Sequence, residues 1–288
     1  MLKKRVAATL VMKNEIIVQS INFNKYLPVG KPGIAMEFLN QWGIDEIILL
    51  DISATRNKIS PSYSLVKEAS RKCYVPLTIG GGINHIDHIK ELMQCGADKI
   101  SLNQAAILNP SLITEAARIF GNQCVVVSID AIYTNKGYSV YDYISKKYLS
   151  VSPAEFAKKM EELGAGEILI NSVNRDGSYK GYDIELINSV CASVTVPVIC
   201  CGGAKNATDI IDVFSNTNVS AASASNFYHF TEHSVNISKA NIRKYIDVRL
   251  ETFVNYENNS FNDELRVKKK SDKELEEMLF IRIEKEII

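Results

Sequence analysis

The chain has 288 residues, and its 33 lysines and arginines balance its 33 aspartates and glutamates. This neutral charge gives no electrostatic reason to expect a nucleic acid or an acidic membrane surface as a partner. The length is typical of one (β/α)8 barrel of about 250 residues with an appendage. No apolar run approaches the roughly 18 residues of a membrane span, and the basic N-terminus lacks a small-residue cleavage site, so we expect a cytoplasmic protein.

Strand-like runs alternate with amphipathic helical stretches along the chain. The runs are nearly continuous in Val, Ile and Leu, which is typical of parallel strands that are covered on both faces. The eight predicted strands are residues 6–11, 46–51, 77–79, 99–102, 124–129, 168–170, 196–200 and 219–222. Eight such units predict an α/β fold, the (β/α)8 or TIM barrel.

Two glycine-rich phrases follow strands at equivalent places in the chain. Residues 75–82 read VPLTIGGG, and residues 196–203 read VPVICCGG. Pro76 and Pro197 are 121 residues apart, and so are Glu46 and Glu167 in a second pair of similar phrases. This repeat predicts two duplicated half-barrels of four strands each. Glycines at strand ends expose backbone N–H groups that suit a phosphate, although they also serve tight turns.

Two long segments after predicted strands have the length of active-site lids. Residues 21–32 follow the first strand. Residues 131–150 follow the fifth strand and contain five tyrosines. The tyrosines either line a ligand site or belong to a small hairpin, 137–144 with 147–151, that packs on the rim.

Neither the cysteines nor the histidines predict a metal site. The six cysteines form no C-x-x-C pair, and we interpret them as small buried hydrophobic residues of a reducing compartment. His85 and His88 form an H-x-x-H pair, but Asp87 would point elsewhere on a helix. We expect neither a metal nor another cofactor.

The pattern changes after Leu250, which we take as the boundary between the barrel, residues 1–250, and a charged tail, residues 251–288. Ser271 and Glu274 predict a capping box at the start of a final helix. The tail either docks on this protein or on a partner, or it stays solvated.

Four phrases, at residues 120–130, 164–169, 174–177 and 181–183, resemble the HisF family, the cyclase subunit of imidazole glycerol phosphate synthase. The resemblance covers about residues 4–250. It implies a barrel whose base docks on a HisH-like glutaminase and whose centre conducts ammonia. At the top, two aspartates at the ends of strands 1 and 5 would act as general acid and base in closing an imidazole ring on a phosphorylated substrate.

The resemblance also implies three groups of site residues. The phosphate and substrate positions correspond to Asp51, Gly82, Ser101, Asn103, Asp176, Gly177, Gly202, Gly203, Ala224 and Ser225. The gate for ammonia corresponds to Arg5, Glu46, Lys99 and Glu167, and the glutaminase interface to Asp98 and Gln123. The alternative for the four gate charges is an ion-pair plug without transport.

The top of the first strand departs from the family. Val11 stands where one catalytic aspartate belongs, while its partner Asp130 is kept. Valine cannot transfer a proton, and losing a general acid or base typically costs about 10²–10⁴ in rate. Gln19 and Leu27 also replace cations that would hold a doubly phosphorylated substrate, and Asn174 replaces an aspartate.

Residues 9–12, which read TLVM, are similar to the WbuZ-type HisF paralogues of polysaccharide sugar amidation. That resemblance implies a subunit that supplies ammonia to a separate, ATP-using sugar amidotransferase, which forms an acetamidino group. Two alternatives stay open. The chain is a working cyclase (a lyase) of histidine biosynthesis, or it is a scaffold that only activates the glutaminase.

Overall fold

The structure is a computed structural model that describes residues 3–230, 233–250 and 261–263 and the single residues 268, 271 and 273. Most of the predicted tail, including the helix predicted after Ser271, lies outside the described residues. The domain boundary at residue 250 therefore stays a prediction.

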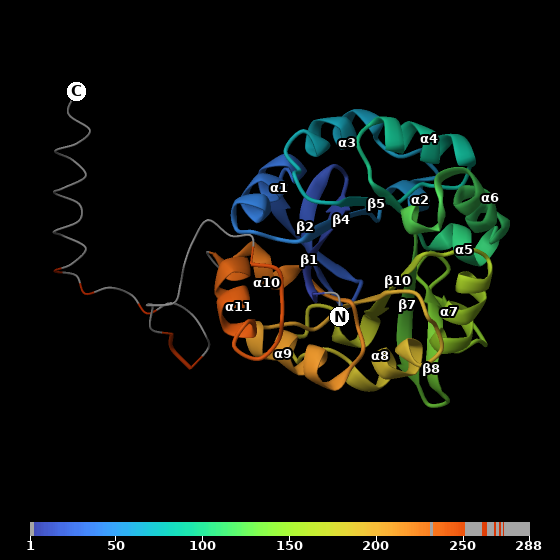
Figure 1. Cartoon of the computed structure of the whole chain (residues 1–288). Coiled ribbons are helices and arrows are strands. Elements are labelled where there is room, and N and C mark those ends of the chain that lie inside the picture. Colours follow the sequence, from blue (N-terminus) through green and yellow to red (C-terminus); the bar gives the residue numbers. More distant parts are fainter. Residues whose placement is uncertain are drawn as a thin grey trace, which may run out of the picture.

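Eight parallel strands form a closed barrel with helices around it (Figure 1). In order around the barrel they are β1 (Arg5–Lys13), β4 (Glu46–Asp51), β5 (Leu77–Gly80), β6 (Lys99–Leu102), β7 (Val125–Thr134), β10 (Glu167–Ser172), β11 (Val198–Cys201) and β12 (Ala221–Ala224). The circle closes because β12 pairs with β1 and β7 pairs with β10. The predicted fold is confirmed, and each of the eight predicted strands is present.

The helices lie in a ring outside the strands. They are α1 (Pro32–Gln41), α2 (Ala54–Asn57), α3 (Tyr63–Ser70), α4 (Ile86–Gln94), α5 (Gln104–Leu108), α6 (Ser111–Phe120), α7 (Pro153–Glu162), α8 (Ile184–Cys191), α9 (Ala207–Asn216), α10 (Asn226–His229) and α11 (Ser234–Ile242), with short 3-10 turns η1 (Asn122–Cys124) and η2 (Val173–Arg175). Several of these helices begin at residues whose side chains cap the helix N-terminus. Ser152 and Glu155 form a capping box at α7, and Asp183 caps α8.

Two hairpins stand on the carboxyl-terminal face of the barrel. The first, β2 (Ile16–Ile21) with β3 (Lys25–Gly30), corrects the prediction of a lid loop over residues 21–32. Proline is unfavourable inside a sheet, but β3, which contains Pro28, pairs with β2 alone, and an edge strand tolerates the missing N–H group. The second, β8 (Gly137–Asp142) with β9 (Lys147–Tyr148), confirms the hairpin predicted among the tyrosines.

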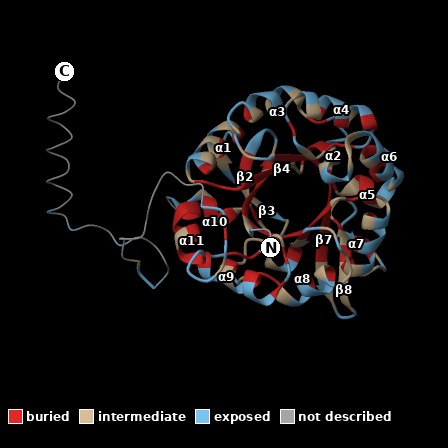
Figure 2. Ribbon diagram, viewed as in Figure 1, coloured by how far each residue is buried: buried red, intermediate tan, exposed pale blue. Residues whose placement is uncertain are grey.

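Buried side chains form two separate shells. The larger shell fills the space between strands and helices, where Figure 2 shows buried residues on the strands and on the inward helix faces. The smaller shell lies inside the barrel and consists of Ile48, Val126, Leu169, Ile199 and Ala221. Because side chains two residues apart on a strand share a face, Glu46 lies below Ile48 inside the barrel, and Leu50 lies above it. The axis therefore passes from a charged layer at Glu46 to apolar side chains at Ile48 and Leu50.

Candidate functional site

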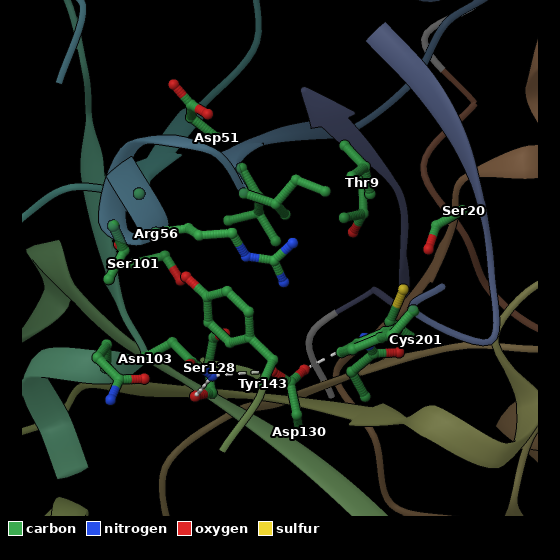
Figure 3. A pocket seen from close by; sticks show the side chains of 18 of the residues that line it. Thr9, Ser20, Asp51, Arg56, Ser101, Asn103, Ser128, Asp130, Tyr143 and Cys201 are labelled. Atoms are coloured by element: carbon green, nitrogen blue, oxygen red, sulfur yellow. Dashed lines mark hydrogen bonds between the residues drawn. The ribbon is translucent and has the colours of Figure 1, made fainter. Parts of the chain in front are cut away.

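A pocket opens at the carboxyl ends of the barrel strands, where (β/α)8 enzymes place their active sites (Figure 3). Its volume is about 100 Å3. The predicted site residues that line it are Val11, Asp51, Gly82, Ser101, Asn103, Asp130, Asp176 and Ser225. Residues far apart in the chain, predicted from the sequence, are thus brought to one place.

Asp130, at the inner end of the pocket, is a buried carboxylic acid without a carboxyl partner. Asn103 Nδ2 donates to its Oδ2 at 3.1 Å, and Asn171 Nδ2 donates to its Oδ1 at 3.4 Å. Burial raises the pKa of Asp130 to about 7, and the two amide hydrogen bonds oppose that rise. A group with this pKa both gives and takes a proton near neutral pH. Val11 lines the same pocket and has no proton to exchange.

The first glycine loop, after β5, is shaped by close backbone approach. A Cβ on Gly81 would lie 2.1 Å from the Asp51 carbonyl oxygen. The Gly82 N–H donates to Thr55 Oγ1 at 3.0 Å. The Asp51 carboxylate accepts hydrogen bonds from Ser53 N and Oγ at 2.8 and 2.6 Å, and Figure 3 shows it turned away from the pocket centre. Asp51 therefore holds the loop that presents α2.

The second glycine loop, after β11, forms its own smaller pocket of about 30 Å3. It is lined by Gly177, Gly202, Gly203, Ala224 and Ser225, which the resemblance implies as phosphate and substrate positions. The Ser225 hydroxyl is buried and has no hydrogen-bond partner. A ligand oxygen is the kind of group that would satisfy such a hydroxyl.

Asp176 is engaged by the first hairpin. Its Oδ2 accepts from the Ser20 hydroxyl at 2.7 Å and from the Phe23 N–H at 3.0 Å. Burial raises the pKa of Asp176, and these two hydrogen bonds oppose the rise. A Cβ on the neighbouring Gly177 would meet the Ser20 carbonyl oxygen at 2.5 Å. Asp176 and Gly177 therefore seat the β2–β3 hairpin on the rim of the pocket.

Four charged side chains close a ring at the opposite end of the barrel. Arg5 bonds to both Glu46 and Glu167, and Lys99 Nζ lies 2.9 Å from Glu46 and 2.7 Å from Glu167. Burial alone would lower the pKa values of Arg5 and Lys99, but the two carboxylates outweigh it and raise both. Arg5 and Lys99 thus stay charged, and the ring pairs two basic with two acidic side chains, so that its formal charges cancel.

The two predicted interface residues lie beside this ring and are exposed. Asp98 precedes β6 and accepts the Leu77 N–H at 2.8 Å. Gln123 lies in η1, just before β7. The predicted gate and the predicted interface therefore share the base of the barrel.

The histidines after the first glycine loop serve local structure. His85 accepts the Asp87 N–H at 3.3 Å and caps α4, while His88 Nδ1 lies 3.2 Å from the Gly82 carbonyl oxygen. Among the described residues, no three His, Cys, Asp or Glu side chains are grouped for a metal. In the described ranges, no helix is long and apolar enough to cross a membrane.

Several pocket residues were not singled out from the sequence, and two of them carry polar groups on long side chains. Arg56, on α2, and Tyr143, in the turn between β8 and β9, both reach into the pocket (Figure 3). Tyr143 was one of five tyrosines whose role stayed open, and no pattern distinguished it. Arg56 follows a strand at the active face, which is the signal that was available.

The closed barrel, its repeated glycine loops and its pocket at the strand ends define a half-barrel-repeat (β/α)8 protein. A family model described as "Histidine biosynthesis protein" matches residues 5–234. This chain belongs to that family, and within it to the HisF group.

Three relatives represent the similarity. A Vibrio vulnificus (strain YJ016) protein named "Putative imidazole glycerol phosphate synthase subunit hisF2" is 43% identical over 90% of this chain and 95% of its own length. HisF subunits of the same synthase from Lactococcus lactis subsp. lactis (strain IL1403) and Clostridium botulinum (strain Okra / Type B1) are 41% and 40% identical. They cover 85% and 82% of this chain, and 95% and 94% of their own lengths.

Proposed function

We propose that this chain is the barrel subunit of a glutamine-dependent complex. It receives ammonia from a HisH-like glutaminase at its base and delivers it at the top pocket. The final acceptor is a surface-polysaccharide sugar, which a separate ATP-dependent amidotransferase converts to an acetamidino sugar. One observation carries the proposal: the ring of four charges is complete, while Val11 lies where Asp130 would need its partner.

The base supports passage of a small neutral molecule. The ring is neutral, and above it the barrel interior is lined by the five apolar side chains of the inner shell. Ammonia, but not ammonium, tolerates such a lining, because a bare cation loses its hydration there. Exposed Asp98 and Gln123 place hydrogen-bonding groups beside the ring for a glutaminase to contact.

The top supports an acceptor other than the ribonucleotide of histidine synthesis. Ring closure in the family uses two carboxylic acids, and here Val11 stands at the position of one of them while Asp130 remains. A second candidate function, the cyclase itself, is favoured by the pKa of Asp130 near 7 and by the names of the relatives. Rescue of a histidine auxotroph that lacks HisF distinguishes the two. We expect no rescue, and rescue at normal growth rate would establish the cyclase.

Passage through the barrel is tested by two neighbouring alanines of β12. Ala221 belongs to the inner shell and Ala222 to the outer one, and both are fully buried. A221V and A222V add the same two methyl groups at a similar packing cost, but only A221V narrows the axis.

We expect A221V, and not A222V, to lower the acetamidino sugar formed per glutamine hydrolysed. The acetamidino sugar is measured by mass spectrometry of the surface polysaccharide in strains that carry each variant. Glutamine hydrolysis is measured as glutamate release by the purified complex. Equal yields from the two variants would favour a scaffold that only activates the glutaminase.

A further inference from the structure

The surface around the mouth of the top pocket carries an excess of lysines. It is made of the segments that connect each barrel strand to the outer helix after it, and we call it the rim: residues 14–31, 52–62, 81–85, 103–110, 131–152, 173–183, 202–206 and 225–230. Its exposed lysines are Lys25, Lys31, Lys58, Lys136, Lys146, Lys147, Lys180 and Lys205. Within these ranges, Glu15 is the single exposed acid. Because the whole chain is neutral, this excess of positive charge is a property of one face of the molecule.

The protein itself does not neutralise these rim lysines. The ion pairs of lysines in the described part of the chain involve Lys3, Lys72, Lys90, Lys99 and Lys239. No rim lysine forms an ion pair or a side-chain hydrogen bond with another described residue. A group of like charges without counter-charges attracts anionic surfaces and raises the rate at which they associate.

The rim lysines lie outside the pocket. The described lining of the pocket contains one cation, Arg56, and none of the rim lysines. The smaller pocket at the second glycine loop has no rim lysine in its lining either. The rim lysines are instead spread over the segments that follow β1, β4, β7, β10 and β11. A small ligand inside the pocket would leave them uncovered, whereas a macromolecule seated over the mouth would meet several of them at once.

Large apolar side chains are exposed on the same rim. They include Ile16, Leu27, Ile59, Tyr133, Tyr148 and Tyr179, which are between 42% and 63% exposed. Tyr133 is held in place by the ring of Tyr138, whose centroid lies 4.8 Å from its own. Exposed aromatic side chains with a fixed orientation are typical anchors of protein interfaces, and the charges around such anchors orient the partner. The rim therefore has the composition of a surface that binds an acidic protein.

We infer that the rim is the docking surface for the ATP-dependent sugar amidotransferase, and that this enzyme presents an acidic surface around its own entrance for ammonia. The inference rests on the proposed function, in which ammonia arrives at the top pocket and is used by a separate enzyme. Ammonia that is released into water at neutral pH becomes mostly protonated, as other amines do, and the cation is not a nucleophile. An enzyme docked over the mouth receives the neutral molecule before it meets bulk water.

The test uses the full chain in complex with its glutaminase, together with the purified amidotransferase, ATP and the sugar substrate. K146E/K147E reverses two neighbouring charges in the turn of the second hairpin. We expect it to weaken binding of the amidotransferase, measured by biolayer interferometry, by about tenfold or more, because like charges then face each other. K158E/K159E is the matched control, since it reverses two neighbouring exposed lysines on α7, outside the rim, and it should bind normally.

The same variants separate docking from the other steps. With K146E/K147E, amidation that depends on glutamine should fall with binding, while glutamate release is unchanged. Amidation from added ammonium chloride should also be unchanged, because that route bypasses the barrel. K180E/K205E, on the segments after β10 and β11, should give the same pattern, so that the test does not depend on the fold of one hairpin. Raising the salt from about 50 to about 300 mM should weaken binding more for the unaltered protein than for either rim variant.

Normal binding by both rim variants, or an equal loss in the α7 control, would overturn the inference. Slower amidation with unchanged binding would also overturn it, because the rim would then steer a small anion to the pocket. Amidation from glutamine without any binding of the amidotransferase would contradict docking and leave the proposed function standing. If the unaltered complex gave no amidation from glutamine while ammonium chloride did, the proposed function itself would be wrong, and this inference with it.

Discussion

The two ends of the barrel differ in how their charged groups are matched. At the base, each of the four charges contacts two of opposite sign. At the top, three carboxylates and one arginine line the pocket, and Val11 lines it where the family has a second acid to work with Asp130. A neutral, self-paired ring suits the passage of a neutral molecule whatever its destination. The acceptor chemistry, by contrast, depends on single side chains at the top, which can change while the base stays as it is.

The largest expected effect comes from restoring the missing acid. V11D restores a carboxyl group at the strand 1 position of the pocket that Asp130 lines. If proton transfer is what the top lacks, turnover of the histidine-pathway ribonucleotide with ammonia should rise by about 10²–10⁴-fold over the unaltered protein. V11N is the matched control, because it has nearly the same shape but no proton to transfer at neutral pH. Equal rates in the two variants would show that other losses, such as Gln19 and Leu27, decide the acceptor.

Asp130 should also make stability depend on pH. Its pKa is raised to about 7 by burial, whereas an aspartate in the unfolded chain titrates near 4. Between these values the folded chain keeps a proton that the unfolded chain loses, so the free energy of unfolding falls as the pH rises from about 4 to about 7. A separation of about three pH units corresponds to at most roughly 4 kcal/mol.

The D130N substitution removes the carboxyl group, and with it the fall in the free energy of unfolding between about pH 4 and pH 7. In urea unfolding we expect it to gain stability over the unaltered protein at pH 8 and to match it near pH 4.5. Asp142 is the control: burial would raise its pKa, but hydrogen bonds from Ser145 and the Ile144 N–H outweigh burial and lower it. D142N should therefore lose stability above pH 4. If the free energies of unfolding of D130N and of the unaltered protein changed with pH in parallel, Asp130 would not be an acid whose pKa is raised by burial.

The contribution of the ion-pair ring to stability is tested by removing one of its charges. E46Q leaves Arg5 and Lys99 with one carboxylate between them, and we expect a loss of about 3 kcal/mol in the free energy of unfolding. Glu37 is matched to it, since it pairs with Lys72 at 3.0 Å but is 46% exposed, against 1% for Glu46. E37Q should cost less than about 1 kcal/mol. Similar midpoints of urea unfolding for the two variants would mean that the ring is no more than a surface ion pair.

The same contrast explains what could be predicted from the sequence. The barrel was predictable because the chain contains eight apolar runs, each of which is a local signal. The two glycine phrases, 121 residues apart, then indicated the repeat of two halves. The ring was predictable because Glu46, Lys99 and Glu167 each begin a strand, so parallel packing gathers them at one end. The resemblance then indicated which of the gathered residues belong to the site.

The top was less predictable because its contacts join elements that are distant in sequence. Asp176 bonds to Ser20 across 156 positions, and no pattern near either residue indicates that pairing. The β3 strand was missed because Pro28 is typical of a loop, and only the finished sheet shows that its edge is free. Arg56 and Tyr143 enter the pocket by side-chain direction, which spacing alone does not fix.

The smallest expected effect concerns the hairpin that covers the top. Ser20 supplies one of two hydrogen bonds to the Asp176 carboxylate, so S20A should weaken the closed position of β2–β3 by about 1 kcal/mol. The amides of that hairpin, including Phe23, should then exchange with deuterium about fivefold faster. S145A is the matched control, since Ser145 donates to Asp142 at the same 2.7 Å but on the other hairpin. Exchange at Glu46 and Lys99 should not change in either variant, because the ring does not depend on the hairpin. Faster exchange at both ends in S20A would mean that the top and the base open together, which would contradict a ring that is stabilised by its own ion pairs alone.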